Sequence, residues 1–131
     1  MSDAKHQPVQ AASLPKPAGP YSPGIGFERL VIVSGQGATD PETGKLAGSD
    51  VETQTRQVFR NIQAILEAGG SDLSKVLRCG VFLTDIRDFA RMNAVYAEVF
   101  GDHRPARTTV QVAGLPEPGL YVEIDAIAYR D

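Results

Sequence analysis

The chain has 131 residues and a formal net charge of −3, so it is long enough to bury an ordinary core, and we expect one domain over residues 1–131. Its acidic balance and scattered basic residues argue against a general attraction to nucleic acid or to an anionic membrane. The single cysteine excludes an intrachain disulfide, and the two histidines have no ligand-like spacing, so we expect no metal site.

The N-terminal segment predicts an arm. Residues 1–18 are polar and rich in proline, which disfavours helices and interior strands, so we expect a partly extended or flexible segment with an edge strand around Val9 at most. Residues 1–16 lack the apolar core of a secretory signal, and no stretch of the chain is long enough to span a membrane. A cytoplasmic location is therefore expected.

A strand, a turn and a helix are predicted next. Residues 30–36 are typical of a buried strand that ends in small residues, and residues 40–44 have the composition of a turn. Ser49 and Glu52 fit a capping box at the start of a helix, and Gly69-Gly70 supplies its C-terminal stop. The apolar residues of this helix follow one stripe, made of Val58, Phe59, Ile62, Ile65 and Leu66.

A further strand is predicted at about residues 76–84, and its expected apolar face consists of Leu77, Cys79, Val81 and Leu83. Because Cys79 lies inside this apolar run, we expect a buried thiol and not a reactive one.

A second helix is predicted from about residue 86 to residue 100, with Asp85 as the N-cap and Gly101 as the stop. Its apolar stripe is Phe89, Met92, Tyr96, Val99 and Phe100. Asn93 lies beside this stripe, where it is either a satisfied buried amide or a site residue.

Two strand-like segments near the C-terminus combine apolar and charged residues. Side chains alternate between the two faces of a strand, so residues 121–129 place Val122, Ile124, Ala126 and Ala128 on one face and Tyr121, Glu123, Asp125, Ile127 and Tyr129 on the other. In residues 107–112, Val110 and Val112 point one way, and Arg107, Thr109 and Gln111 point the other.

The loop between these segments is short and turn-rich, so the two strands could pair as a hairpin. Arg107, Thr109 and Glu123 would then share one sheet face. That face would suit a small anionic substrate; the alternative is an exposed polar face with a surface ion pair.

The predicted order is β-β-α-β-α-β-β, with the first strand doubtful. Two helices are too few to cover both faces of such a sheet, so we expect them on one face of a two-layer α+β fold. The other face is too apolar for plain exposure, and we expect a second copy of the chain to bury it. This face is predicted to carry Phe82, Tyr121, Ile127 and Tyr129 together with Arg107, Gln111 and Glu123.

The chain resembles the reactive intermediate deaminase family, also called the Rid or YjgF family. The resemblance covers most of the chain, and its most specific part is Pro105-Ala106-Arg107 followed by residues 122–128. The other matching segments are Gly19-Pro20-Tyr21-Ser22, Ser34-Gly35-Gln36, Asp40-Pro41-Glu42-Thr43-Gly44, Asn61, Asp88-Phe89, Asn93, Tyr96 and Leu115-Pro116.

This resemblance implies a chorismate-mutase-like subunit in a homotrimer, with a central barrel and clefts between neighbouring subunits. It also implies hydrolysis of 2-imino acids and their enamine tautomers, which pyridoxal-phosphate enzymes release, to 2-oxo acids and ammonia. No metal or organic cofactor is implied, and the expected partners are a small imino acid and two further copies of the chain.

The family's functional residues map onto seven positions. The resemblance implies that Arg107 binds the substrate carboxylate, that Glu123 positions or activates water, and that Tyr21 donates a proton or orients the substrate. It also places Ser34, Gly35 and Asn93 in the cleft. Thr109 stands where many deaminases of the family have cysteine. Threonine keeps the backbone carbonyl that is thought to orient water, so this difference leaves deamination open but puts the subgroup and the substrate range in question.

Other functions fit the same residues. The substrate could be another small enamine such as an aminoacrylate, or the cleft could bind a 2-oxo acid for regulation without turnover. A stress chaperone is a further alternative. A ribonuclease, an older label in this family, is disfavoured by the acidic balance and by the lack of a basic stripe.

Overall fold

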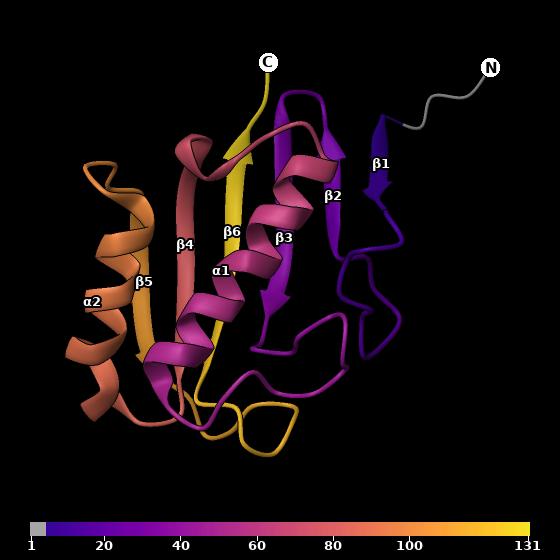
Figure 1. Ribbon diagram of the computed structural model, residues 1–131. Helices are drawn as coiled ribbons and strands as arrows, with labels where there is room; N and C mark the ends of the chain where they lie inside the picture. Colours follow the sequence, from indigo (N-terminus) through magenta and orange to yellow (C-terminus); the bar gives the residue numbers. More distant parts are fainter. Residues whose placement is uncertain (1–4) are drawn as a thin grey trace.

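The computed structural model describes residues 5–131, and in it two helices cover one face of a six-stranded sheet (Figure 1). The strands are β1 (His6–Val9), β2 (Gly24–Phe27), β3 (Leu30–Gln36), β4 (Val76–Leu83), β5 (Ala106–Gln111) and β6 (Val122–Tyr129). The helices are α1 (Val51–Ala68) and α2 (Phe89–Phe100), with short 3₁₀ turns at Leu73–Lys75 and Ile86–Asp88. The predicted α+β class and the edge strand around Val9 are confirmed.

Strand β2 was not predicted. Its two glycines deprive the sequence of the alternating side chains that mark a strand. Gly24 is needed because a Cβ there would lie 2.9 Å from a methyl group of Ile65 and 3.0 Å from the carbonyl oxygen of Ile32. The close packing of α1 on the sheet therefore requires glycine in this strand, and a strand with so few side chains shows no alternating pattern in the sequence.

The sheet order is β1-β2-β3-β6-β4-β5, and only the β4–β5 pair is parallel. The predicted hairpin between residues 107–112 and 121–126 is therefore wrong. Helix α2 returns the chain so that β5 runs beside β4, and the loop after β5 then carries the chain past the end of β4 to β6. Strand β4 lies between the two segments.

The core lies between the helices and the inward faces of β3, β4 and β6. The predicted inward face of β6 and the predicted stripe of α1 are buried, each residue being at most 2% exposed. In β4, Cys79, Val81 and Leu83 are buried as predicted, but Leu77 is 47% exposed. A shift in the β4–β6 register between Val76 and Arg78 adds a residue there, and this bulge turns Leu77 outward.

The helix ends confirm most of the predicted signals. Helix α1 begins after Asp50, not after Ser49, because the Asp50 carboxylate accepts a hydrogen bond of 2.7 Å from the Thr53 N–H. Glu52 forms no capping box and pairs with Arg91 of α2 at 2.8 Å. Gly69 ends α1 as predicted.

The second predicted helix begins with a 3₁₀ turn, in which the Asp85 side chain accepts from the Arg87 N–H as the expected cap. The regular α-helix starts only at Phe89 and ends at Gly101, whose φ of 62° favours glycine.

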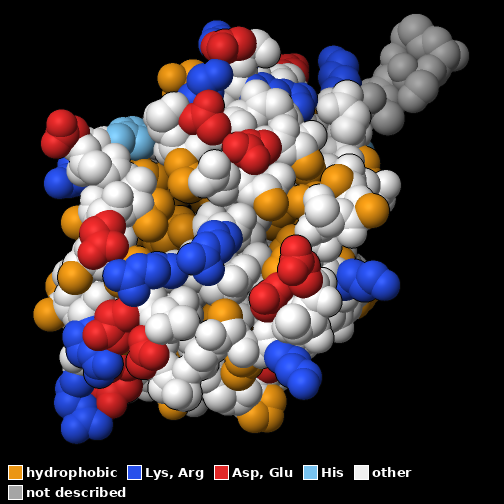
Figure 2. All heavy atoms as spheres, viewed as in Figure 1, with side chains coloured by type: hydrophobic (Ala, Val, Ile, Leu, Met, Phe, Trp, Pro, Cys, Tyr) orange, Lys and Arg blue, Asp and Glu red, His pale blue; other side chains and the backbone are white. Residues whose placement is uncertain are grey.

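The two faces of the molecule differ in character. Figure 2 shows the helical side, where charged groups of both signs surround apolar side chains between the helices. On the opposite sheet face, Ile32, Val110 and Tyr129 are 37–43% exposed, and no element within residues 5–131 covers them. None of the helices in this range is long and apolar enough to cross a bilayer.

Strand β4 offers a matched test of this packing. Leu83→Ala should lower the free energy of unfolding by about 2–5 kcal/mol, because Leu83 is fully buried and its truncation leaves a cavity. Leu77→Ala on the same strand should cost less than half as much. Urea unfolding at one fixed protein concentration measures both. Equal losses would contradict the bulge at Leu77.

Candidate functional site

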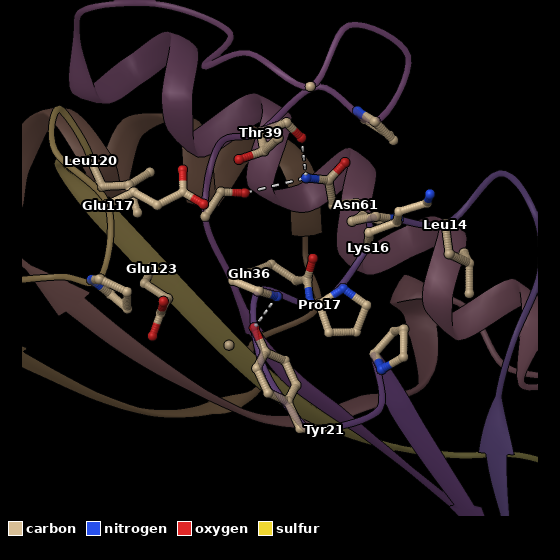
Figure 3. A pocket seen from close by; sticks show the side chains of 18 of the residues that line it. Leu14, Lys16, Pro17, Tyr21, Gln36, Thr39, Asn61, Glu117, Leu120 and Glu123 are labelled. Carbon is tan, nitrogen blue, oxygen red and sulfur yellow. Dashed lines mark hydrogen bonds between the residues drawn. The ribbon is translucent and has the colours of Figure 1, made fainter.

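The predicted site residues fall into two groups. One group lies around a cavity of about 420 Å³ beside the end of β3, between the N-terminal arm, the β3–α1 loop and the β5–β6 loop (Figure 3). Tyr21 just after the arm, Gly35 on β3 and Glu123 on β6 line this cavity, and Figure 3 shows Tyr21 and Glu123 on two of its walls.

Ser34 and Gly35 lie where β3 departs from regular pairing with β6, since the register shifts between Val33 and Gln36. This irregularity leaves the strand end available to bind the segment that follows the arm. The Ser34 N–H donates to the Pro23 carbonyl at 2.9 Å, and the Ser34 hydroxyl donates to the Ser22 carbonyl at 2.6 Å. Ser34 therefore holds the segment that carries Tyr21.

The Tyr21 side chain is half exposed at the mouth of the cavity. Its phenolic oxygen accepts a hydrogen bond of 3.2 Å from the Ala18 N–H, which orients the ring against the end of the arm. A phenol accepting one bond retains its own proton for donation, so Tyr21 has a proton to offer to a ligand in the cavity.

Glu123 lies against the backbone of β3 because Gly35 has no side chain. A Cβ at Gly35 would come within 2.7 Å of the Glu123 carboxylate. Burial raises the pKa of Glu123 above its usual value, and the negative charge of Asp125 raises it further. No ion pair within residues 5–131 involves Glu123. These conditions favour proton transfer by this carboxylate.

Asp125 is held on the same face of β6 by a second glycine. Its carboxylate accepts a 2.8 Å hydrogen bond from the Gly80 N–H, and a Cβ at Gly80 would lie only 2.5 Å from the same oxygen. Two positions apart on one strand, Asp125 and Glu123 point to the same side. Gly80 thus fixes the position of the Asp125 carboxylate, whose negative charge raises the pKa of Glu123.

Two amides of α1 anchor the loops that wall the cavity. Gln54 donates to the carbonyls of Gly48 at 3.0 Å and Gly119 at 2.8 Å, and its own oxygen accepts from the Tyr121 N–H at 2.8 Å. Asn61 likewise donates to the carbonyls of Gly37 and Thr39, at 3.2 and 2.8 Å.

The role of Gln54 was missed at the level of sequence. The available signal was an amide two helical turns before Asn61 on the buried stripe of α1, since buried amides need partners.

The second group consists of Arg107, Asn93 and Thr109, on the helical side of the sheet at its β5 edge. Arg107 and Asn93 line a cavity of about 330 Å³, whose walls are Asn93, Tyr96, Ala97, Arg104, Pro105 and Arg107. The Arg107 guanidinium carbon lies 4.7 Å from the centre of the Tyr96 ring and 5.5 Å from that of Phe89. These rings restrict the guanidinium. No carboxylate within residues 5–131 lies within 4.0 Å of it.

Two buried polar atoms in this region, Asn93 Oδ1 and Thr109 Oγ1, have no hydrogen-bond partner among the described residues, while Tyr96 Oη lies beside the Cys79 thiol. Buried polar groups normally have partners, so unsatisfied ones near an unpaired guanidinium indicate a place for a polar ligand. Cys79 lies beneath them. Burial raises the pKa of its thiol to about 11, which keeps the thiol protonated and supports the predicted unreactive role.

The predicted common face for Arg107, Thr109 and Glu123 is wrong. Arg107 pairs with Cys79, whose side chain faces the helices, and Thr109 pairs with Val81 on that same side. Glu123 pairs with Phe82. Phe82 comes directly after the inward-facing Val81 on β4, so both Phe82 and Glu123 face away from the helices. Gln111 lies on the same side of β5 as Arg107, so the prediction that both residues lie on the outer face of the sheet is also wrong.

One chain thus brings Tyr21, Ser34, Gly35 and Glu123 together, and separately Arg107, Asn93 and Thr109. Within residues 5–131 no three His, Cys, Asp or Glu side chains cluster closely enough to hold a metal ion. The chemistry available to the two groups is therefore recognition of an anion by one and proton transfer by the other.

Comparison with known proteins agrees with the sequence resemblance. Residues 11–130 match the family model described as Endoribonuclease L-PSP, and the chain belongs to this family, which is the Rid or YjgF family. A RutC family protein of Pyrococcus horikoshii is 50% identical over 117 residues, which cover 89% of this chain and 92% of that protein.

Two further relatives carry names or ligands that bear on activity. The 2-iminobutanoate/2-iminopropanoate deaminase of Bos taurus is 40% identical over 130 residues, covering 99% of this chain and 94% of that protein. The crystal structure of E. coli TdcF with bound serine superposes with a TM-score of 0.89 at 37% identity, over 95% of this chain and 99% of that chain. The chain shares its fold with that structure.

The raised pKa of Glu123 predicts a pH-dependent effect on stability. At neutral pH the ionised carboxylate is disfavoured by the fold, because the folded-state pKa lies above the unfolded value of about 4.3. Glu123→Gln should therefore raise the melting temperature at pH 7. The gain should fade as the pH drops below about 4, where Glu123 is protonated in both states. Melting temperatures of both proteins across this pH range test the sign; a gain that grew on acidification would contradict it.

Proposed function

We propose that the chain hydrolyses reactive 2-imino acids and their enamine tautomers, released by pyridoxal-phosphate enzymes, to 2-oxo acids and ammonia. The observations that carry this proposal are a guanidinium without an acidic partner in the described residues, Arg107, and a carboxylate whose pKa is raised by burial, Glu123. The bovine relative and a Salmonella typhimurium relative at 41% identity are both named as deaminases of this class. The serine bound to E. coli TdcF is an amino acid of similar size to these imines.

Arg107 is the proposed binding residue for the substrate carboxylate. A guanidinium forms two parallel hydrogen bonds to a carboxylate, which fixes both the position and the plane of the substrate. The stacking of Tyr96 and Phe89 on Arg107 reduces the entropy that the side chain loses on binding. Asn93 and the backbone carbonyl of Thr109 would complete this half of the site around the imine and the attacking water.

Glu123 is the proposed base. It accepts a proton from water as the water oxygen bonds to the imine carbon, and the imine nitrogen gains a proton. The amino group of the resulting carbinolamine then gains the proton that the hydroxyl loses, the C–N bond breaks, and ammonia leaves the 2-oxo acid. Tyr21 would donate or orient a hydrogen bond near the nitrogen, while Ser34 and Gly35 shape the wall behind it.

Because the two groups lie on opposite faces of one sheet, a complete site requires two copies of the chain. We propose a homotrimer in which Arg107 of one copy meets Glu123 of the next. The uncovered sheet face provides the driving force, since burial of each large apolar side chain contributes about 1.5–3 kcal/mol. Polar groups on the same face then need partners in the neighbouring copy.

A coupled assay tests the reaction and these roles. A serine or threonine dehydratase generates the imine in the presence of semicarbazide, and an active deaminase lowers semicarbazone formation. Arg107→Ala should abolish this effect, while the control Arg56→Ala, which removes an exposed arginine paired with Glu98, should not. Glu123→Gln should reduce turnover by roughly a hundredfold or more. Binding of a 2-oxo acid without any turnover would favour a regulatory module.

Mixing the two inactive variants tests the shared site. Arg107→Ala and Glu123→Gln chains, unfolded together and reassembled at equal amounts, should regain activity in about a quarter of the sites of a ring of three, because random assembly pairs an intact Arg107 with an intact Glu123 that often. Each variant reassembled alone is the control. An absence of rescue in well-assembled mixtures would exclude a site built from two copies.

The assembly itself is open to direct measurement. Light scattering or sedimentation equilibrium at micromolar concentration should give about three times the chain mass of 14.0 kDa. A folded and fully active monomer would contradict both the trimer and the position of the site.

A further inference from the structure

The cavity that contains Arg107 is also lined by a second arginine. Arg104 precedes Pro105 and contributes to the same 330 Å³ space as Arg107, Asn93 and Tyr96. The proposed reaction assigns a carboxylate to Arg107 and leaves Arg104 without a role.

Arg104 is held in place by neutral groups. Its Nη1 donates to the backbone carbonyl of Gly101 and, at 3.1 Å, to that of His103, at the C-terminal end of α2. These contacts orient the guanidinium but leave its charge intact, and they occupy only Nη1 of its three nitrogens. Arg104 therefore retains donors for a ligand.

Neither guanidinium has an acidic partner in the chain. No carboxylate within residues 5–131 lies within 4.0 Å of Arg104 or Arg107, and no Asp or Glu contributes to the cavity wall. A ligand with one carboxylate would satisfy one of the two charges. A ligand with two carboxylates would satisfy both, and the cavity is large enough for a small dicarboxylic acid.

Building on the proposed function, we infer that the preferred substrates are imines of dicarboxylic amino acids. Arg107 binds the carboxylate next to the imine carbon, and Arg104 binds the carboxylate of the substrate's side chain. Arg104 is then a specificity-determining residue, because it makes its contact only with substrates that carry the second charge.

Paired substrates test this preference. Amino-acid oxidases generate the imine of aspartate or the imine of alanine in the presence of semicarbazide, and kcat/KM is measured for each. The wild-type protein should favour the dicarboxylic imine by about 10- to 100-fold, the range that a charged hydrogen bond supplies. Arg104→Gln should remove this preference, so that the ratio of the two kcat/KM values approaches one. Arg104→Lys should retain part of the preference.

Matched variants separate recognition from folding. Arg104→Gln removes the positive charge and keeps an amide that can form hydrogen bonds, and circular dichroism verifies the fold. Arg87→Gln removes an exposed arginine elsewhere on the surface and should change neither rate. An equal preference for both imines in the wild type, or an unchanged preference in Arg104→Gln, would overturn the inference.

A binding measurement decides the inference even if the proposed reaction fails. Succinate and propionate are stable probes with two carboxylates and one, and calorimetry gives the affinity of each. Succinate should bind about 10-fold or more tightly than propionate to the wild type, and the difference should vanish in Arg104→Gln. Turnover of neither imine would refute the proposed function alone. Equal affinities for the two acids would refute the role of Arg104.

Discussion

The strict alternation of side chains along β6 is the constraint on which the rest of the structure depends. This strand lies between β3 and β4, and its inward residues are the apolar floor on which the helices pack. Its outward residues include Glu123 and Asp125, so the same strand builds the core and carries the candidate base. A shift of one residue in its register would bury both carboxylates and expose the core.

The raised pKa of Glu123 favours proton transfer but lowers the stability of the folded state at neutral pH. Gly35 and Gly80 have no Cβ, and this allows two carboxylates to lie against neighbouring strands where burial and mutual repulsion keep Glu123 hard to ionise. The raised pKa that suits proton transfer is, by linkage, a cost to the folded state at neutral pH. The buried amides Gln54 and Asn61 hold the surrounding loops against α1 through hydrogen bonds.

The separation of opposite charges has its own physical logic. Direct contact between Arg107 and Glu123 would pair the two charges, which would neutralise the anion-binding group and lower the pKa of the base. The sheet prevents this by holding them on opposite faces. In the proposed assembly they approach only across an interface, where a substrate and water can lie between them.

Local patterns in the sequence determined much of this protein. The apolar faces of β6 and α1, the glycine stops of both helices, the buried thiol and the α+β class follow from periodicity and turn chemistry, and the resemblance to the Rid family is confirmed. Of the site, the resemblance supplied the seven predicted residues, but it supplied neither the role of Gln54 nor the arrangement of the residues on the sheet.

Only the tertiary structure decided how these pieces meet. The outward turn of Leu77, the insertion of β4 between the last two strands and the opposite faces of Arg107 and Glu123 depend on strand pairing between residues far apart in the chain. Periodicity within a segment specifies which residues share a face of that strand. It contains no information on which strand lies beside it, or in which phase the two pair, because those are set by packing over the whole sheet.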